Sequence, residues 1–131
     1  RGFLTGRLRS TASLDPGDVR TTNPRFAEAN IEGNLRIVDT VEEVAREAHA
    51  TPAQVALAWL LSRGDDIAPI PGTKRRKYLE DNAGAVDVHL STEEVAELEA
   101  AVPHEEVAGE RYAADVSLRP MYDPTSARVR A

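Results

Sequence analysis

The chain has 131 residues and a formal net charge of −6, with 41% hydrophobic and 29% charged residues. This balance fits one globular domain that buries about two thirds of its unfolded surface, and it excludes an intrinsically disordered chain. Cysteine is absent, which excludes disulfides and thiolate metal sites and favours a cytoplasmic location. No apolar run reaches about 18 residues, so we expect no segment that spans a membrane.

Two glycines enclose a short apolar pair at the start of the chain, Arg1-Gly2-Phe3-Leu4-Thr5-Gly6-Arg7. Main-chain N–H groups in such a turn can approach a phosphate closely, although many surface turns share the pattern. The chain begins without a methionine or a signal-peptide pattern, and we expect it to be a piece of a longer protein. Residues 8–29 are polar and show no sustained period, which predicts a loop, and Phe26 is expected to anchor its end.

Apolar residues at spacings of three, four and seven predict an amphipathic helix over residues 30–49, with His49 at its C-terminal end. Thr51-Pro52-Ala53-Gln54 predicts a second helix that begins with a capping box and ends near Gly64. This second helix is apolar on nearly every side, so it needs cover from a larger body, and Trp59 is expected to be a packing anchor.

The stretch Ile67-Ala68-Pro69-Ile70-Pro71 predicts a short strand at 67–70, although its prolines remove hydrogen-bond donors. Gly72 and Thr73 follow, and then four cations at 74–77, the last three of which begin a helix predicted over 75–83. A strand that runs through a glycine turn into a helix N-terminus favours an anion site, because the helix dipole and the cations attract negative charge. The alternatives are a solvated basic face, or a non-catalytic helical module whose patch at 74–77 binds a partner or an anion.

Residues 86–90 alternate briefly and are expected to be extended. Ser91 and Glu94 form a second capping box, which predicts a last helix that Pro103 ends.

The sequence contains no recognisable catalytic or metal-binding pattern. His89 and His104 lack a partner at metal-ligand spacing, and HExxH, Walker A, GxGxxG and GxSxG patterns are absent. Glu105 and Glu106 are adjacent, so their side chains would diverge and make a poor acid–base pair. The residues by themselves therefore indicate anion binding without a reacting group.

Several segments resemble the C-terminal portion of the aldo/keto reductases, and more narrowly the perakine-reductase-like branch of bacteria and plants. They are Arg-Gly-Phe-Leu-Thr-Gly (1–6), Thr-Pro-Ala-Gln-Val-Ala-Leu-Ala-Trp-Leu-Leu (51–61) and Ile-Pro-Gly-Thr-Lys-Arg-Arg-Lys-Tyr-Leu-Glu-Asp-Asn (70–82). Leu-Ser-Thr-Glu-Glu-Val (90–95) and Glu-Val-Ala-Gly-Glu-Arg-Tyr (106–112) are also similar. The resemblance covers residues 1–112 and leaves 113–131 as a polar C-terminal tail.

This resemblance implies an α/β fold, the C-terminal part of a TIM (β/α)8 barrel, mostly helical within this chain and with its eighth strand at 67–70. It implies an NADP(H)-dependent reductase of aldehydes or ketones, with a small-molecule carbonyl substrate. The family's catalytic Tyr, Asp, Lys and His match no residue here, so we expect the chain to be inactive alone. Its uncovered apolar helix suggests self-association, and the net charge argues against nucleic acid as a partner.

The resemblance also implies which residues contact the cofactor. Residues 1–7 match the loop after the seventh strand, which touches the pyrophosphate, and barrel enzymes often build phosphate sites from the loops after strands 7 and 8. Residues 72–74 match family residues that contact the 2′-phosphate side of the cofactor, and 81–82 match a Glu-Asn pair that holds the adenine. Tyr78 stands where many members have an arginine, so the phosphate charge would come from Lys74, Arg75 or Arg76. The candidate cofactor-binding residues are Arg1, Gly2, Leu4, Thr5, Gly6, Arg7, Gly72, Thr73, Lys74, Arg75, Tyr78, Asp81 and Asn82.

Overall fold

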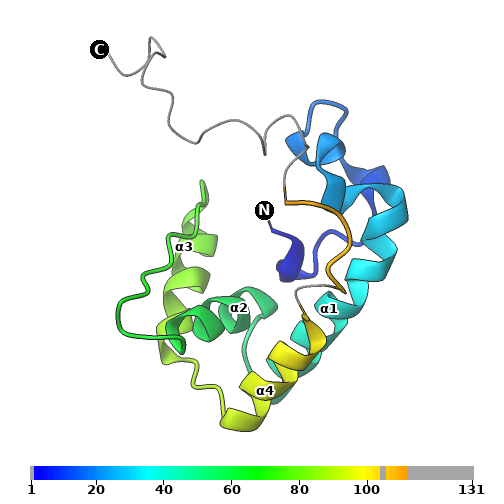
Figure 1. Cartoon of the computed structure of the whole chain (residues 1–131). Helices are drawn as coiled ribbons and strands as arrows, with labels where there is room; N and C mark the ends of the chain where they lie inside the picture. The colour runs from blue at the N-terminus through cyan, green and yellow to red at the C-terminus, as the bar shows by residue number, and fades with distance from the viewer. Residues whose placement is uncertain (1, 104–105, 112–131) are drawn as a thin grey trace, which may run out of the picture.

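The computed structural model describes residues 2–103 and 106–111, and these residues form an array of helices joined by turns and irregular segments (Figure 1). The α-helices are α1 (Glu28–Glu47), α2 (Pro52–Leu61), α3 (Arg76–Ala83) and α4 (Thr92–Ala101), and the 3₁₀ turns are η1 (Phe3–Thr5), η2 (Thr11–Ser13), η3 (Val19–Thr22), η4 (Pro24–Phe26) and η5 (Gly84–Asp87). Arg1 and the predicted polar tail at 113–131 lie outside the described residues. None of the described helices is long and apolar enough to cross a membrane.

The segment predicted as a loop, residues 8–29, is a series of single 3₁₀ turns up to residue 27, and its last two residues already belong to α1. Ser10, Asp18 and Asn23 each accept a hydrogen bond from the N–H two residues further on, which begins η2, η3 and η4 respectively. Short polar side chains at such positions favour single turns over longer helices because they satisfy the first free N–H groups. Phe26 is buried and packs edge-on against Phe3, with ring centroids 5.6 Å apart, so the predicted anchor is confirmed.

The helix predicted over 30–49 is present as α1. One face of α1 is buried, and the residues on it are Ile31, Asn34, Ile37, Val38, Val41, Val44 and Ala45. His49 follows the helix at φ 51°, a left-handed conformation that ends the helical run, and its N–H donates to the carbonyl of Arg46.

The core forms where α1 meets α2 and α4. Its buried members are Val41, Val44, Ala45, Val55 and Leu98, and Ala50, Trp59 and Leu90 pack against them. Both predicted capping boxes are confirmed, Thr51 with Gln54 at the start of α2 and Ser91 with Glu94 at the start of α4. α2 ends at Leu61, earlier than predicted, and its Leu60 and Leu61 are exposed. The apolar surface of α2 is therefore only partly covered by the described chain.

The strand predicted at 67–70 was wrong: no strand occurs within the described residues, and 67–73 has no regular structure. A strand needs a neighbour that completes its ladder, and Pro69 and Pro71 cannot donate to one. Ile70 is 95% exposed, so it is not part of a buried strand here. The extended segment expected at 86–90 was also wrong in part, because η5 occupies its first residues.

Candidate functional site

The structure brings the N-terminal turn and the start of α3 into contact. Nη1 of Arg7 donates a hydrogen bond to the phenol oxygen of Tyr78, 71 positions further along the chain. The guanidinium carbon of Arg7 also lies 5.4 Å from the centroid of the Tyr78 ring, which is within the range of a cation–π contact. Two segments that the sequence marked separately as anion-binding are thus neighbours.

Arg75 approaches the same ring from the residue that precedes α3. Its guanidinium carbon lies 5.8 Å from the Tyr78 centroid, so two cations share one aromatic partner. The hydrogen bond from Arg7 is the main cause of a lowered pKa of Tyr78, and the positive charges of Arg7 and Arg75 add to it. Two guanidinium groups held this close make a local positive potential that suits a phosphate.

The geometry of η1 orients Arg7. Gly2 and Gly6 flank the turn at φ 77° and 72°, values that favour glycine, and Thr5 Oγ1 donates to the Gly2 carbonyl over 2.6 Å. The N–H of Arg7 reaches Thr5 Oγ1 at 3.5 Å, which directs the chain out of the turn. A Cβ at Gly6 would meet the Glu42 carboxylate of α1, so the absence of a side chain at Gly6 lets the turn lie close to α1.

Residues 72–75, just before α3, combine an accessible main chain at Gly72 with the exposed positive charge of Lys74. A Cβ at Gly72 would meet no atom within 4 Å, so a ligand can approach this main chain. Thr73 Oγ1 accepts the N–H of Arg75 at 3.2 Å, and the side chain of Arg75, the N-cap residue of α3, makes no capping hydrogen bond. Lys74 is exposed and has no hydrogen bond or ion pair with another described residue. The open helix start and this lysine complete a set of donors for an anion.

Tyr78, Asp81 and Asn82 occupy positions i, i+3 and i+4 of α3 and therefore share one face of the helix. Asp81 is already engaged: its Oδ1 accepts from Thr51 Oγ1 at 3.3 Å, and its carbonyl accepts from Gln54 Nε2 at 3.0 Å. These bonds tie the end of α3 to the start of α2. Asn82 is half-buried beside it.

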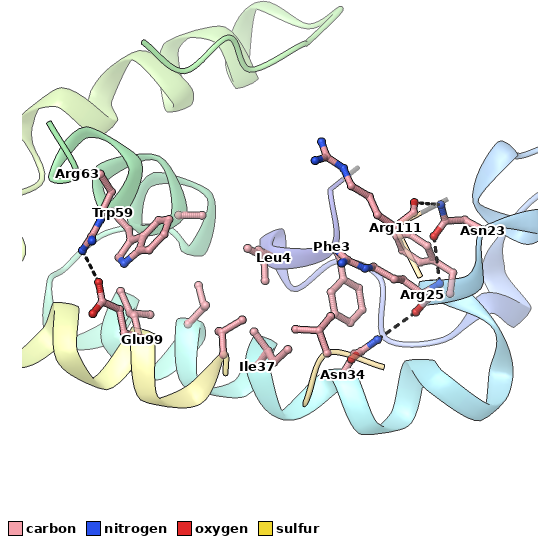
Figure 2. A pocket seen from close by; sticks show the side chains of 16 residues that line it. Phe3, Leu4, Asn23, Arg25, Asn34, Ile37, Trp59, Arg63, Glu99 and Arg111 are labelled. Carbon is pink, nitrogen blue, oxygen red and sulfur yellow. Dashed lines mark hydrogen bonds and ion pairs between the residues drawn. The ribbon is translucent and has the colours of Figure 1, made fainter. Parts of the chain in front are cut away.

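Leu4 of η1 lines a cavity of about 600 Å³ between η1, α1, α2 and α4. In Figure 2, Phe3 and Leu4 reach into this space, and Ile37 of α1 and Trp59 of α2 form further walls. The indole Nε1 of Trp59 is buried without a hydrogen-bond partner in the described chain. No pattern in the sequence predicted this cavity, although Trp59, expected to be a packing anchor, lines it.

The chain belongs to the aldo/keto reductase family, whose sequence model matches residues 1–103. It is 49% identical over 112 residues to the NADP(+) aldo-keto reductase yakc of Schizosaccharomyces pombe, covering 86% of this chain and 33% of the relative. It is 41% identical over 113 residues to aldo-keto reductase str7 of Strobilurus tenacellus (86% and 34%), and 41% identical over 112 residues to probable aldo-keto reductase 1 of Glycine max (86% and 32%). The chain thus spans about a third of the length of these curated relatives.

Proposed function

We propose that this chain is the C-terminal part of the TIM barrel of an NADP(H)-dependent aldo/keto reductase that reduces aldehydes or ketones to alcohols. In this proposal the chain supplies the cofactor's phosphate and adenine site, and the catalytic residues come from the rest of the protein. Membership of the family supports the reductase activity, and the name of the relative yakc, which contains NADP(+), supports the choice of cofactor.

The observation that carries the proposal is the contact of Arg7 and Arg75 with Tyr78. It joins the two segments expected to face the cofactor, and it concentrates positive charge in a chain whose net charge is −6. The donor set fits a dinucleotide phosphate, since guanidinium groups, an ammonium group and main-chain N–H groups are the usual phosphate ligands.

Each candidate residue has a role in this proposal. Arg7 and the η1 turn, residues 2–7, hold the pyrophosphate, and Arg1 would extend that loop. Gly72 and Thr73 let the 2′-phosphate approach the main chain, while Lys74 and Arg75 supply its counter-charge. Tyr78 offers a ring face to the adenine, and Asp81 and Asn82 border it. When bound, NADPH supplies the hydride for carbonyl reduction.

The alternative of a non-catalytic basic patch at 74–77 has less support. Arg76 Nε lies 2.8 Å from a carboxylate oxygen of Glu80, so part of the patch charge is balanced within α3.

Replacement of Lys74 by glutamate in the full-length enzyme tests the proposal. We expect Lys74→Glu to weaken NADPH binding by about 10- to 100-fold, or about 1.4–2.8 kcal/mol, and to change NADH binding little, because only NADPH carries the 2′-phosphate. The measurement is the dissociation constant of each cofactor by fluorescence titration. Lys77→Glu, at another exposed lysine three positions away, is the matched control. Equal losses for both cofactors would contradict the role of Lys74.

A further inference from the structure

Residues 106–111 form a segment that the cofactor site does not use, and we call it the strap. It runs beside the first half of α1 and the turn at residues 23–25, as the orange trace in Figure 1 shows. The same residues carry part of the Glu-Val-Ala-Gly-Glu-Arg-Tyr motif, so the motif has a structural partner within the chain.

Side chains from α1 and from residues 23–25 bind the main chain of the strap. The carbonyl oxygens of Glu106, Ala108, Gly109 and Arg111 accept from Arg36 Nη2 (3.3 Å), Asn34 Nδ2 (2.9 Å), Arg25 Nε (3.3 Å) and Asn23 Nδ2 (3.1 Å). The N–H of Ala108 in turn donates to Asn34 Oδ1 at 2.9 Å. Asn34 therefore pairs with both the donor and the acceptor of one strap residue, as a neighbouring β-strand would.

The burial of the asparagines shows that this pairing is built into the fold. Asn34 is 2% exposed and Asn23 is 8% exposed, and both use side-chain amide hydrogens on the strap. The second amide hydrogen of Asn34 reaches the carbonyl of Arg25 at 3.3 Å (Figure 2). A buried amide without partners is costly, so departure of the strap would leave unsatisfied groups on α1.

Gly109 sets how closely the strap can lie. Its φ is 83°, and a Cβ at this position would stand 2.6 Å from the carbonyl oxygen of Pro24. A side chain here would strain the main chain and push it away from residues 23–25.

We propose that Asn23, Arg25, Asn34 and Arg36 form a docking groove for an extended main chain, that its occupant is the chain's own strap, and that the strap is a removable wall of the 600 Å³ cavity. Val107 and Arg111 of the strap line this cavity. The other walls belong to η1, η4, α1, α2 and α4, whereas the strap is bound through four main-chain carbonyls and the N–H of Ala108. Its release therefore opens the cavity without unfolding the helices. This inference does not depend on the proposed cofactor role.

The Glu106 side chain contributes less to this docking than the strap's main chain does. Glu106 pairs with Arg36 at 2.7 Å, but both side chains are about half exposed, where an ion pair contributes little. The groove thus fixes the position of the strap's main chain. Gly109 is the strap residue at which a side chain would not fit.

Hydrogen–deuterium exchange of the full-length protein tests this inference. We expect Asn34→Ala to speed exchange of the peptide covering 106–111 by about 10-fold, because the pairing with Ala108 is lost. The apolar dye anilinonaphthalene sulfonate should also bind faster to this variant. Thr40→Ala is the matched control, since Thr40 is a polar residue of α1 whose hydroxyl donates to the Arg36 carbonyl within the helix and not to the strap.

Gly109→Ala keeps the test decisive if Asn34→Ala destabilises the whole protein. This variant leaves the buried asparagines in place and should speed exchange in the strap while α1 stays protected. Glu106→Gln should leave strap exchange unchanged. The inference is overturned if Gly109→Ala leaves strap exchange at the wild-type rate, or if Thr40→Ala speeds it as much as Asn34→Ala does.

Discussion

At the scale of single residues, Tyr78 is the side chain on which the candidate site converges. Its phenol oxygen accepts from Arg7, and its ring lies close to both Arg7 and Arg75. Because a donated hydrogen bond and nearby positive charge favour the phenolate, the pKa of Tyr78 lies below its ordinary value of 10.0. An arginine at this position would repel Arg7 and Arg75, whereas the tyrosine ring allows both guanidinium groups to lie beside it.

This contact predicts an early alkaline transition of one tyrosine. Absorbance at the phenolate band should show Tyr78 titrating below the ordinary tyrosine range, and Arg7→Gln should raise its pKa. The folded pKa is depressed, so the associated stability is present above the unfolded pKa of about 10 and is lost as pH falls through the folded pKa.

Tyr78→Phe assigns the signal in that titration, because it should remove the early component. An early component that persists in Tyr78→Phe, or a Tyr78 pKa that does not change in Arg7→Gln, would contradict the arrangement.

At the scale of elements, the helix starts follow from local chemistry. Thr51 and Ser91 each pair reciprocally with a residue three positions on, which satisfies main-chain N–H groups that a helix start leaves free. The two caps differ in one respect, because Thr51 Oγ1 also reaches Asp81 Oδ1 and links α2 to α3.

This difference predicts unequal costs for removing the caps. Ser91→Ala should destabilise the full-length protein by about 1 kcal/mol, and Thr51→Ala by about 1–2 kcal/mol, because the second change also removes the link to Asp81. Urea unfolding measures both, and Thr51→Ser, which keeps the hydroxyl, is the control. A larger cost for Ser91→Ala than for Thr51→Ala would show that the link to α3 contributes nothing.

At the scale of the whole molecule, the described chain leaves large apolar side chains in contact with solvent. Ile70, Leu79 and Val86 are 95%, 59% and 65% exposed, and Leu60 and Leu61 of α2 are also exposed. Burial of such side chains is the main favourable term in association, and the chain spans about a third of its relatives. In the proposed TIM barrel, residues outside this chain would cover these groups.

The isolated 131-residue chain is therefore expected to self-associate. Sedimentation velocity should show species larger than a monomer that grow with concentration, and Ile70→Ser combined with Leu79→Ser should reduce them. The matched control is Val19→Ser, at a residue that is 78% exposed in the η3 turn. A monomer at every concentration, with one cooperative thermal transition, would refute the expectation.

Much of this architecture was predictable because it depends on neighbours in the sequence. The apolar spacing of α1 and the capping pairs of α2 and α4 each involve residues within one or two turns. The single 3₁₀ turns at residues 8–29 could have been found from Ser10, Asp18 and Asn23, which are residues that commonly cap turns. The strand at 67–70 could not be judged in this way, because a strand exists only if another strand pairs with it.

The sequence alone specified where α2 and α4 begin, and the glycines and cations of residues 1–7 and 72–77 marked these segments as candidate anion sites. It could not specify that Arg7 meets Tyr78, that Asp81 is tied to Thr51, or that Asn34 holds Ala108. Those pairs are separated by 71, 30 and 74 positions. Contacts over such separations depend on how the helices pack around the core, and no local pattern encodes that packing. Residues of the candidate site could therefore be named from the sequence, whereas the contacts between them follow only from the tertiary structure.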